Sequence, residues 1–337
     1  MSEQTKSRKG DHIRIALEED VDYEYNFFDD INFIHEPLSK LNYDDLDLKI
    51  KFIDHELNTP LMITAITGGY EEGKKINKKL AEACEKYDLA FGLGSQRAMI
   101  EKPELIETYK VREVAPSIPI VGNIGAAQLI SYDSFQINDM LKNVDANYLA
   151  VHLNTLQELI QPEGDRNFKG LTEKIISISK EIEYPIILKE TGAGITYDSV
   201  KELLSKSNKI KGVDVSGTSG TSWSKIEDFR GGRLGALGEW GNPTPYCVNS
   251  FKNSNTLVIA SGGIQNGLDV AKALALGADV AGSANPLLKA QFNGTLNEEI
   301  ENWITDLKRV MMLTNSSTPK ELRKSKLVIS GYLKYYM

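Results

Sequence analysis

Residues 152–158, with the sequence HLNTLQE, place four polar side chains that can do chemistry directly after an apolar run. His152, Asn154 and Gln157 can donate and accept hydrogen bonds without a fixed charge. Glu158 offers a hard oxygen ligand that suits Mg²⁺. A hydrophobic core has no use for such a cluster, so the spacing predicts a polar binding site with a metal ion, although a lone His152 would be more typical of a hydrogen-bonded core histidine.

A glycine-rich segment, residues 260–288, has the character of a phosphate site. Gly262, Gly263 and Gly267 allow backbone amides to approach an anion, and the helix that follows presents its positive amino end. Residues 282–285 can complete the cradle from the next strand. The alternative is that these glycines only form tight turns.

Lys189 closes an otherwise apolar strand in the sequence YPIILKE. An ammonium group at the end of a buried strand needs an anion or an electron-rich acceptor, and a flavin ring supplies one near its N1 atom. A salt bridge with a carboxylate such as Glu190 is an equally good interpretation. Neutral donors and acceptors close other strands and suit the polar edge of such a ring: Thr67, Ser95, Asn123, Ser216 and Thr221.

Positive side chains near the amino terminus could hold an anionic ligand. Arg8, Lys9 and His12 lie close together in the sequence, and Arg97 follows a strand. Charged groups of this kind bind phosphate groups through charge-assisted hydrogen bonds. A pair such as Arg8 and Lys9 in a polar tail is also typical of a solvated segment.

Short apolar runs alternate with longer amphipathic segments from residue 60 onward, which predicts repeated strand and helix units around a parallel sheet. Eight strands are expected, at residues 61–66, 89–94, 118–124, 148–153, 185–190, 212–216, 256–261 and 279–284. Helices are expected at residues 73–87, 103–114, 133–143, 169–183, 196–206 and 267–277.

Eight strands could form a closed barrel or a doubly wound open sheet. Nearly every expected strand ends in polar or glycine residues. All eight carboxyl ends of a barrel open onto one face, whereas an open sheet uses only the ends beside its switch point. We therefore expect an α/β fold, a (β/α)₈ TIM barrel, with a long loop at residues 216–245 after the sixth strand. We expect one domain over residues 1–337, with a barrel core at about 58–294, an extension at 1–57 and a helical extension at 295–337.

The composition excludes several classes of protein. Hydrophobic residues make up 41% of the chain and charged residues 26%, as in a soluble globular protein, and no apolar run approaches the roughly 18 residues of a membrane span. A net charge of −8 argues against nucleic acid as a partner. The two cysteines, Cys84 and Cys247, and the four histidines provide no spacing suited to zinc. The amino terminus lacks a secretory signal, so a cytoplasmic location is expected.

Seven motifs occur in the order of one known family: RKGDH at 8–12, TGG at 67–69, GSQR at 94–97, HLNTLQE at 152–158, PEGDR at 162–166, DVSGTSGTSW at 214–223 and SGGIQNG at 261–267. Together they resemble the type 2 isopentenyl-diphosphate delta-isomerases over about residues 8–335. The resemblance implies a barrel that binds FMN and Mg²⁺ and interconverts isopentenyl diphosphate and dimethylallyl diphosphate, a step of isoprenoid biosynthesis, without net redox change. NADPH or another reductant would supply the reduced flavin, whose N5 atom would act as acid and base.

The resemblance also implies roles for individual residues. The flavin ring would contact Ala65, Ile66, Thr67, Ser95, Asn123, Lys189, Ser216 and Thr221. Its phosphate would be held by Gly263, Ile264, Gln265, Ala284 and Asn285. The substrate would be bound by Arg8, Lys9, Ser95, Gln96, Arg97 and Gln157, and the Mg²⁺ ion by Glu158. We expect Gln157 to position or relay a proton, with His152 and Asn154 fixing its orientation.

Two other functions are compatible with parts of the sequence. An FMN-dependent oxidase or dehydrogenase of 2-hydroxy acids would share the SGG phosphate pattern and the strand-end lysine, but it needs a histidine base, and no histidine follows His152. A non-catalytic phosphate-binding barrel is the second alternative. The family and the long loop at 216–245 predict a homotetramer or a homo-octamer.

Overall fold

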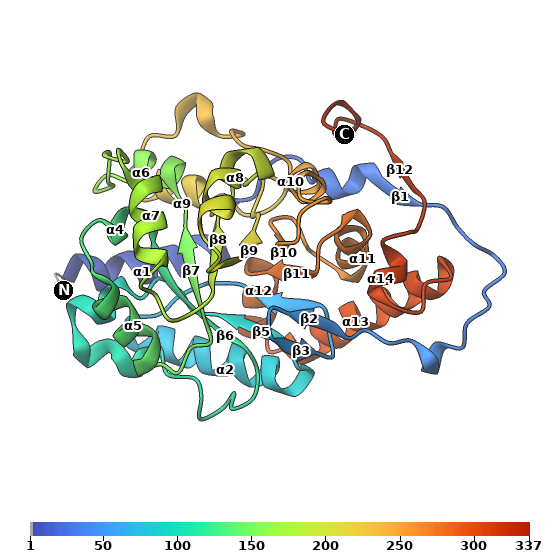
Figure 1. Cartoon of the computed structure of the whole chain (residues 1–337), viewed down its shortest axis with the longest axis horizontal. Helices are drawn as coiled ribbons and strands as arrows, with labels where there is room; N and C mark the ends of the chain where they lie inside the picture. Colours follow the sequence, from blue (N-terminus) through green and yellow to red (C-terminus); the bar gives the residue numbers. More distant parts are fainter. Residues whose placement is uncertain (1–2) are drawn as a thin grey trace.

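Eight parallel strands close a barrel at the centre of the molecule (Figure 1). The computed structural model describes residues 3–337, with side chains from residue 9 onward. The strands follow one another around the barrel in chain order: β4 (Leu61–Ile63), β5 (Ala90–Gly92), β6 (Ile120–Gly125), β7 (Tyr148–His152), β8 (Ile186–Lys189), β9 (Ile210–Asp214), β10 (Leu257–Ser261) and β11 (Val280–Ser283). All eight expected strands are present, so the barrel is confirmed and the open sheet is wrong.

The composition of the strands explains why their polar residues gather at one rim. Strand β7 buries its first four residues and ends on the partly buried His152. Strand β8 follows the same pattern and ends on Lys189. Burial on both faces is typical of parallel strands covered by helices, and it confines polar side chains to the strand ends.

Helices surround the barrel strands (Figure 1). They are α2 (Glu71–Tyr87), α3 (Arg97–Glu101), α4 (Ala126–Leu129), α5 (Ser134–Asn143), α6 (Thr155–Ile160), α7 (Leu171–Ser179), α8 (Tyr197–Lys206), α9 (Trp223–Phe229), α10 (Thr244–Ser250), α11 (Gly267–Leu276) and α12 (Asn285–Asn293). Five of the six expected helices are confirmed, as α2, α5, α7, α8 and α11, with small shifts at their ends.

The helix expected at residues 103–114 is wrong. This segment forms a 3₁₀ helix, η3 (Pro103–Thr108), followed by turns. The turns bring the fully buried Tyr109 to a place where its hydroxyl donates to the carbonyl of Ser95 at 2.7 Å. Tertiary contacts of this kind override the weak helix propensity of a short segment.

A hairpin of β2 (Ile50–Phe52) and β3 (His55–Leu57) covers the amino-terminal end of the barrel. Phe52 and Leu57 are fully buried and pack in one cluster with side chains from inside the barrel, such as Met62 and Ile259. Because apolar side chains fill this end, a ligand can enter only at the opposite, carboxyl-terminal end.

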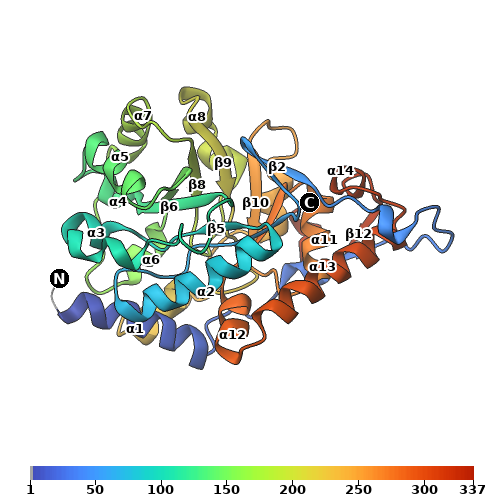
Figure 2. The same ribbon diagram turned by 90° about the horizontal axis from the view of Figure 1, so that it is seen from below.

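The two extensions of the chain meet outside the barrel. Helix α1 (Glu3–Glu18) lies with α2, α12 and α13 (Leu296–Leu313) along one side of the molecule (Figure 2). After η1 (Phe27–Asp30), strand β1 (Ile31–Phe33) pairs antiparallel with β12 (Leu327–Ile329), and η2 (Tyr43–Asp45) follows. The carboxyl-terminal extension contains α13, α14 (Pro319–Leu322) and η5 (Leu333–Tyr335), but β12 makes it only partly helical, because its residues Leu-Val-Ile suit a strand and find a partner in β1.

The long connection after β9 is present as expected and packs on the amino-terminal segment. It contains α9, η4 (Gly235–Leu237) and α10. Ile226 of α9 packs with Ile15 and Val21 in a small separate cluster, and the backbone N–H of Ser222 donates to Val21 O at 2.9 Å. The connection and α1 therefore form one wall at the carboxyl-terminal end of the barrel.

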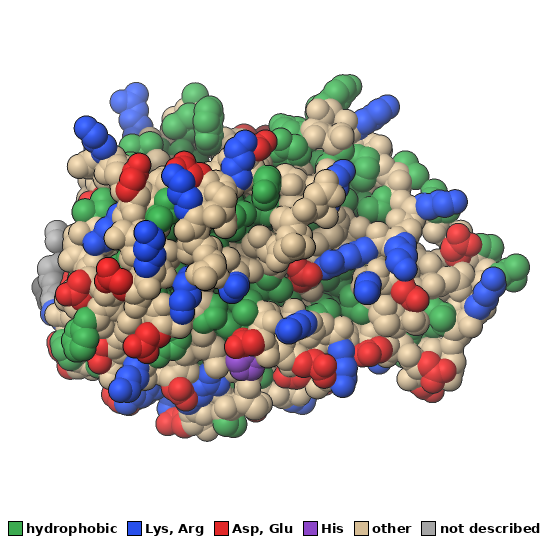
Figure 3. Space-filling view, in the orientation of Figure 1, with side chains coloured by type: hydrophobic (Ala, Val, Ile, Leu, Met, Phe, Trp, Pro, Cys, Tyr) green, Lys and Arg blue, Asp and Glu red, His purple; other side chains and the backbone are tan. Residues whose placement is uncertain are grey.

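The surface carries charges of both signs. Figure 3 shows Lys and Arg side chains interspersed with Asp and Glu side chains over the displayed face. No helix within residues 3–337 is long and apolar enough to cross a membrane. Cys84 and Cys247 are free and buried, and burial raises the pKa of both thiols.

Candidate active site

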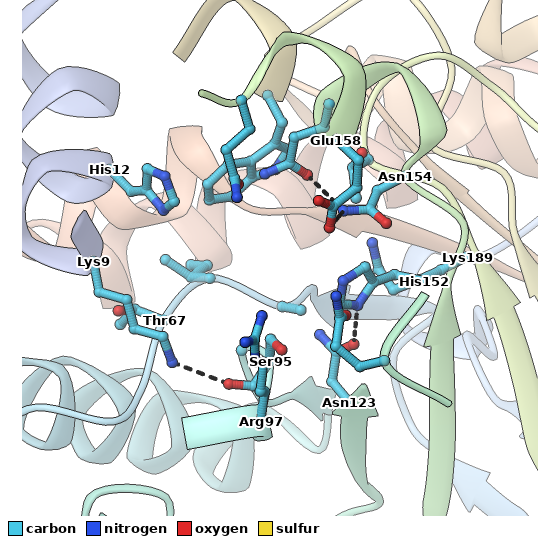
Figure 4. A pocket seen from close by; sticks show the side chains of 18 residues that line it. Lys9, His12, Thr67, Ser95, Arg97, Asn123, His152, Asn154, Glu158 and Lys189 are labelled. Atoms are coloured by element: carbon cyan, nitrogen blue, oxygen red, sulfur yellow. Dashed lines mark hydrogen bonds between the residues drawn. The ribbon is translucent and has the colours of Figure 1, made fainter. Parts of the chain in front are cut away.

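Two adjoining cavities open at the carboxyl-terminal ends of the barrel strands. Ala65, Lys189 and Trp223 line both of them, so together they form one trough across the barrel mouth. Figure 4 shows the first cavity, with side chains of α1 on one side and those of the segment after β7 on the other.

The trough brings together most of the residues selected from the sequence. The first cavity is lined by Lys9, Ala65, Ile66, Thr67, Ser95, Arg97, Asn123, His152, Asn154, Gln157, Glu158 and Lys189. The second cavity is lined by Ser216, Thr221, Gly263, Ile264, Gln265, Ala284 and Asn285, together with Ala65 and Lys189. The side chain of Arg8 lies outside the described residues.

Gln96 reaches neither cavity. Its side chain is fully buried, where Oε1 accepts a hydrogen bond from the backbone N–H of Asn123 at 2.9 Å and Nε2 lies 3.1 Å from Met99 Sδ. In this structure Gln96 fixes strand β6 and touches the site through Asn123, and its expected contact with substrate stays a prediction.

His152 is neutral, and its neighbours set its tautomer. Asn123 Nδ2 donates to the carbonyl of Leu93 at 3.0 Å, which turns Asn123 Oδ1 toward His152. His152 Nδ1 lies 2.8 Å from that oxygen and must donate, which leaves Nε2 as the acceptor. Burial, reinforced by the charge of Lys189, lowers the pKa of His152 to about 3. His152 is thus hydrogen-bonded to Asn123, and the expectation that it orients Gln157 stays a prediction.

Gln157 takes its orientation from two other side chains. Asn154 Nδ2 lies 3.4 Å from Gln157 Oε1. On the other side, Gln157 Nε2 donates to Glu227 Oε1 at 3.2 Å. Because a carboxylate only accepts hydrogen bonds, this contact fixes which end of the amide faces Glu227.

Glu227 is a site residue that the sequence did not reveal. It is fully buried on α9, and His12 Nε2 lies 3.0 Å from the same oxygen that Gln157 contacts. Burial raises the pKa of Glu227, but the hydrogen bond and charge of His12 and the charge of Arg230 outweigh burial and hold the pKa below its usual value. No motif marks Glu227, and an acidic residue within the long connection was the only available signal.

Glu158 is buried in α6 and held from two sides. Asn154 Nδ2 donates to Oε1 at 3.1 Å, and the backbone N–H of Asp165 donates to Oε2 at 2.9 Å. The PEGDR loop can come this close because Gly164 has no side chain: a Cβ there would lie 1.9 Å from the carbonyl oxygen of Glu158. Each carboxylate oxygen has a second acceptor position, which a metal ion can use.

The donor set around Glu158 fits Mg²⁺. Among the described residues, no three His, Cys, Asp or Glu side chains gather as metal ligands. Mg²⁺ commonly takes one or two carboxylates and completes its octahedron with water and phosphate oxygens. Glu158 would therefore hold such an ion together with a phosphate-bearing ligand.

Cations from α1 and α3 line the other side of the first cavity (Figure 4). Lys9 Nζ donates to the carbonyl of Ser95 at 3.0 Å and to the hydroxyl of Tyr109 at 2.7 Å. Arg97 Nε donates to Glu101 at 2.6 Å, but its side chain keeps 45% exposure. The remaining N–H groups of Arg97 can therefore reach an anion in the cavity.

The second cavity has the features of an anion cradle. Gly262 and Gly263 both have φ at +91°, and Ser216 is held at +38°, a strained value for a residue with a side chain. Asn285 is buried where α12 begins, and its Oδ1 finds no hydrogen-bond partner in the described part of the chain. This buried amide oxygen can only accept a hydrogen bond, so it calls for a donor that a ligand or a water molecule can supply. With the amino ends of α11 and α12 nearby, the backbone at Gly262 and Gly263 fits the phosphate of a flavin nucleotide.

Lys189 lies between the two cavities. Its Nζ donates to the backbone oxygen of Glu190 at 2.6 Å, so its contact with Glu190 is made to the backbone. The carboxylate of Glu190 instead accepts the backbone N–H groups of Thr191 and Ala193, each at 2.5 Å. Burial raises the pKa of Glu190 to about 7, and these hydrogen bonds and the charge of Lys189 offset that shift only in part.

Relatives of known name span the whole chain. A family model described as FMN-dependent dehydrogenase matches residues 171–329. The isopentenyl-diphosphate delta-isomerase of Pyrococcus furiosus is 38% identical over 358 aligned positions, which cover 100% of this chain and 90% of the relative. That of Halobacterium salinarum is 40% identical and covers 100% of this chain and 97% of the relative. The chain belongs to the isopentenyl-diphosphate delta-isomerases. The FMN-dependent model and the closed barrel assign it to the type 2 isomerases, which confirms the resemblance of its motifs.

Solved structures agree with the fold. The flavin-binding domain of baker's yeast flavocytochrome b2 superimposes with a TM-score of 0.65 at 16% identity, covering 99% of this chain and 96% of that chain. A mandelate oxidase with an FMN adduct superimposes with a TM-score of 0.62 at 12% identity, covering 90% and 89%. At such low identity the likeness shows a shared (β/α)₈ architecture and no shared substrate.

Proposed function

We propose that this protein interconverts isopentenyl diphosphate and dimethylallyl diphosphate with FMN and Mg²⁺ and without net redox change. The observation that carries the proposal is the trough, in which a cavity lined by Glu158, Lys9 and Arg97 adjoins a glycine cradle at β10 and β11. Two adjacent anion sites suit a diphosphate substrate beside the phosphate of a flavin. The names of the relatives that span the chain support the same activity.

FMN would occupy the second cavity and the shared part of the trough. Its phosphate would be held by Gly263, Ile264, Gln265, Ala284 and Asn285. Its ring would be bound by Ala65, Ile66, Thr67, Ser95, Asn123, Lys189, Ser216 and Thr221. When bound and reduced, with NADPH as the proposed reductant, FMN would supply an acid–base group and an electron-rich ring that stabilises positive charge.

The protein's own side chains would bind and orient the substrate. Glu158 would ligate a Mg²⁺ ion that also takes diphosphate oxygens, and Lys9 and Arg97 would offset the remaining negative charge. Gln157, with its amide fixed by Glu227, would hold a proton in a defined direction. Arg8 is proposed to add a further cation at the same side.

Oxidation of a 2-hydroxy acid is the second candidate, favoured by the FMN-dependent dehydrogenase match and by the shared architecture. That chemistry needs a base for the hydroxyl proton. No histidine follows His152 in the chain, and His152 itself is held beside Asn123. Isomerisation is therefore the function that the site supports best.

The test is a direct assay of isomerisation. Purified protein is incubated without oxygen with FMN, Mg²⁺, NADPH and isopentenyl diphosphate, and dimethylallyl diphosphate is measured. We expect product in the complete mixture, and no product when FMN or Mg²⁺ is left out. Supplying lactate or mandelate with an electron acceptor tests the oxidase alternative. A complete mixture that holds bound, reduced FMN and forms no product would refute the proposal.

We also propose that the protein is a homotetramer or homo-octamer of the cytoplasm. Large apolar side chains are exposed around the barrel mouth, among them Leu159 at 47%, Phe229 at 53% and Trp240 at 62%. Apolar groups in such positions support a contact between subunits. Analytical ultracentrifugation should give four or eight subunits, and a monomer at all concentrations would contradict the proposal.

A further inference from the structure

A band of polar side chains crosses five neighbouring strands near the floor of the trough. His152 of β7 is the register partner of Lys189 of β8, and Lys189 is the register partner of Asp214 of β9. Register partners on neighbouring strands project from the same face of a sheet. Asn123 of β6 bonds His152 at one end of the band, and Ser261 of β10 donates to Asp214 at 2.5 Å at the other end. Asp214 is the acidic member of this band, and the proposed function gives it no task.

Asp214 lies in a part of the barrel that excludes water. It is 3% exposed and borders a small cavity whose lining is apolar apart from Asp214 and Lys189. A buried carboxylate is costly unless hydrogen bonds or an opposite charge compensate it. Ser261 donates the hydrogen bond, and Lys189 supplies the opposite charge while its Nζ donates to the backbone oxygen of Glu190.

The other titratable groups around Lys189 do not balance its charge in the same way. His152 is neutral, since burial lowers its pKa to about 3, and burial raises the pKa of Glu190 to about 7. Burial also raises the pKa of Asp214 above its ordinary value, and the charge of Lys189 with the hydrogen bonds from Ser261 and the backbone of Ser216 offset this shift only in part. The Glu190 carboxylate is taken up by the backbone N–H groups of Thr191 and Ala193, whereas Asp214 lies in register with Lys189 on the neighbouring strand, so Asp214 is the carboxyl group placed to balance the ammonium charge.

We propose that Asp214 is a positioning residue for the flavin site that acts through Lys189. Its carboxylate balances the ammonium charge at the floor of the trough, so that the floor does not strongly favour a negatively charged flavin. The inference rests on the proposed function, because it requires FMN beside Lys189. A double-bond shift needs a proton that is held and returned, whereas a floor with net positive charge favours loss of the flavin N1 proton.

The test is Asp214→Asn, which keeps the shape of the side chain and an acceptor for Ser261 but removes the charge. The midpoint potential of bound FMN is measured by equilibration with a reference dye, and the dissociation constant of the flavin–sulfite adduct by titration. We expect the ratio of reduced to oxidised FMN at a fixed potential to rise by about tenfold, equivalent to about 30 mV for a two-electron couple. Sulfite should bind more tightly in the variant, because its adduct places negative charge on the flavin.

Asp279→Asn is the matched control. It makes the same change at the amino-terminal end of the barrel, where Asp279 accepts the backbone N–H of Val258 and pairs with Arg323. Both measurements should equal those of the unmodified protein. A midpoint potential of Asp214→Asn within error of the unmodified protein would overturn the proposal.

Ser261→Ala provides a second route if Asp214→Asn fails to fold. Removal of the hydroxyl takes away a hydrogen bond that favours the ionised Asp214 carboxylate, so Asp214 should take up a proton more readily as the pH falls. The midpoint potential of bound FMN should then rise more steeply with falling pH than in the unmodified protein. An unchanged pH dependence of the potential would overturn the proposal. If the unmodified protein binds FMN but does not isomerise, the proposed function fails while the comparison of potentials still decides on Asp214. If FMN does not bind at all, both proposals fail.

Discussion

Replacing His152 by asparagine should change how the stability of this protein depends on pH. Burial lowers the pKa of His152 to about 3, well below the ordinary value of 6.5. Below pH 6.5 the unfolded chain binds a proton that the folded chain does not, so His152 lowers the free energy of unfolding as the pH falls. In His152→Asn the amide Nδ2 can take the place of Nδ1 and keep the hydrogen bond to Asn123 Oδ1.

The size of the effect follows from the shift. One pKa unit corresponds to about 1.4 kcal/mol, so His152 costs about 2 kcal/mol of stability per subunit between pH 7 and pH 5. This figure is an upper bound, because His152 borders the open cavity and is only partly buried. Glu190 acts in the opposite direction, because its pKa is raised to about 7. As the pH rises from 5 to 7 the unfolded chain loses a proton that the folded chain largely keeps, which lowers the free energy of unfolding by about 2 kcal/mol. In the unmodified protein the two contributions nearly cancel.

Urea unfolding of the FMN-free proteins, followed by far-ultraviolet circular dichroism, measures the effect. The free energy of unfolding of His152→Asn relative to the unmodified protein should rise by about 2 kcal/mol from pH 7 to pH 5. His35→Asn, in an exposed segment, is the matched control and should shift the free energy by less than about 0.5 kcal/mol. A His152→Asn difference that is the same at every pH would refute the reasoning.

Four further changes test other parts of the site. In the same unfolding assay, Glu190→Gln should gain about 2 kcal/mol relative to the unmodified protein as the pH rises from 5 to 7, and a constant difference would speak against a buried, neutral carboxyl. Glu158→Gln should raise the Mg²⁺ concentration for half-maximal isomerisation by about tenfold or more with unchanged FMN affinity; equal metal dependence would count against a ligand there. Gly164→Ala should lower the free energy of unfolding by about 1–3 kcal/mol, because its Cβ would lie 1.9 Å from the carbonyl oxygen of Glu158, and full stability would show that the PEGDR loop can relax. Gln157→Asn should leave FMN bound and lower turnover by about tenfold or more, whereas a normal rate would remove Gln157 from the reaction.

The barrel could be predicted because its signal is repeated along the chain. Each strand is a short apolar run that ends in polar residues, and eight such ends can share one rim only in a closed barrel. The segment 103–114 shows the limit of this reasoning. Its pattern suits a helix, but the place of Tyr109 against the carbonyl of Ser95 is a contact between distant segments that no local pattern encodes.

The site could be predicted where a residue ends a strand, as Lys189 and His152 do, because the strand direction then decides where the side chain lies. Gln96 and Arg97 could not be separated in this way. Arg97 is the first residue of α3 and reaches the cavity, whereas Gln96 precedes the helix and turns into the protein. Glu227 contacts Gln157 from 70 positions away, and this contact exists only because α9 packs against α6.

The barrel alone supplies only part of the site, because Lys9 and His12 come from α1 and Glu227 from the long connection. His12 and Gln157 share one oxygen of the Glu227 carboxylate, so the docking of α1 and the orientation of the Gln157 amide depend on the same buried group. If α1 left the barrel mouth, Glu227 would lose a partner while it remained buried, and an incompletely compensated buried charge is strongly unfavourable. Departure of α1 would also remove Lys9 from the cavity that Glu158 lines. The anion site should therefore be complete, and Gln157 correctly oriented, only while α1 is docked at the barrel mouth. Catalysis then depends on the amino-terminal helix as well as on the barrel strands.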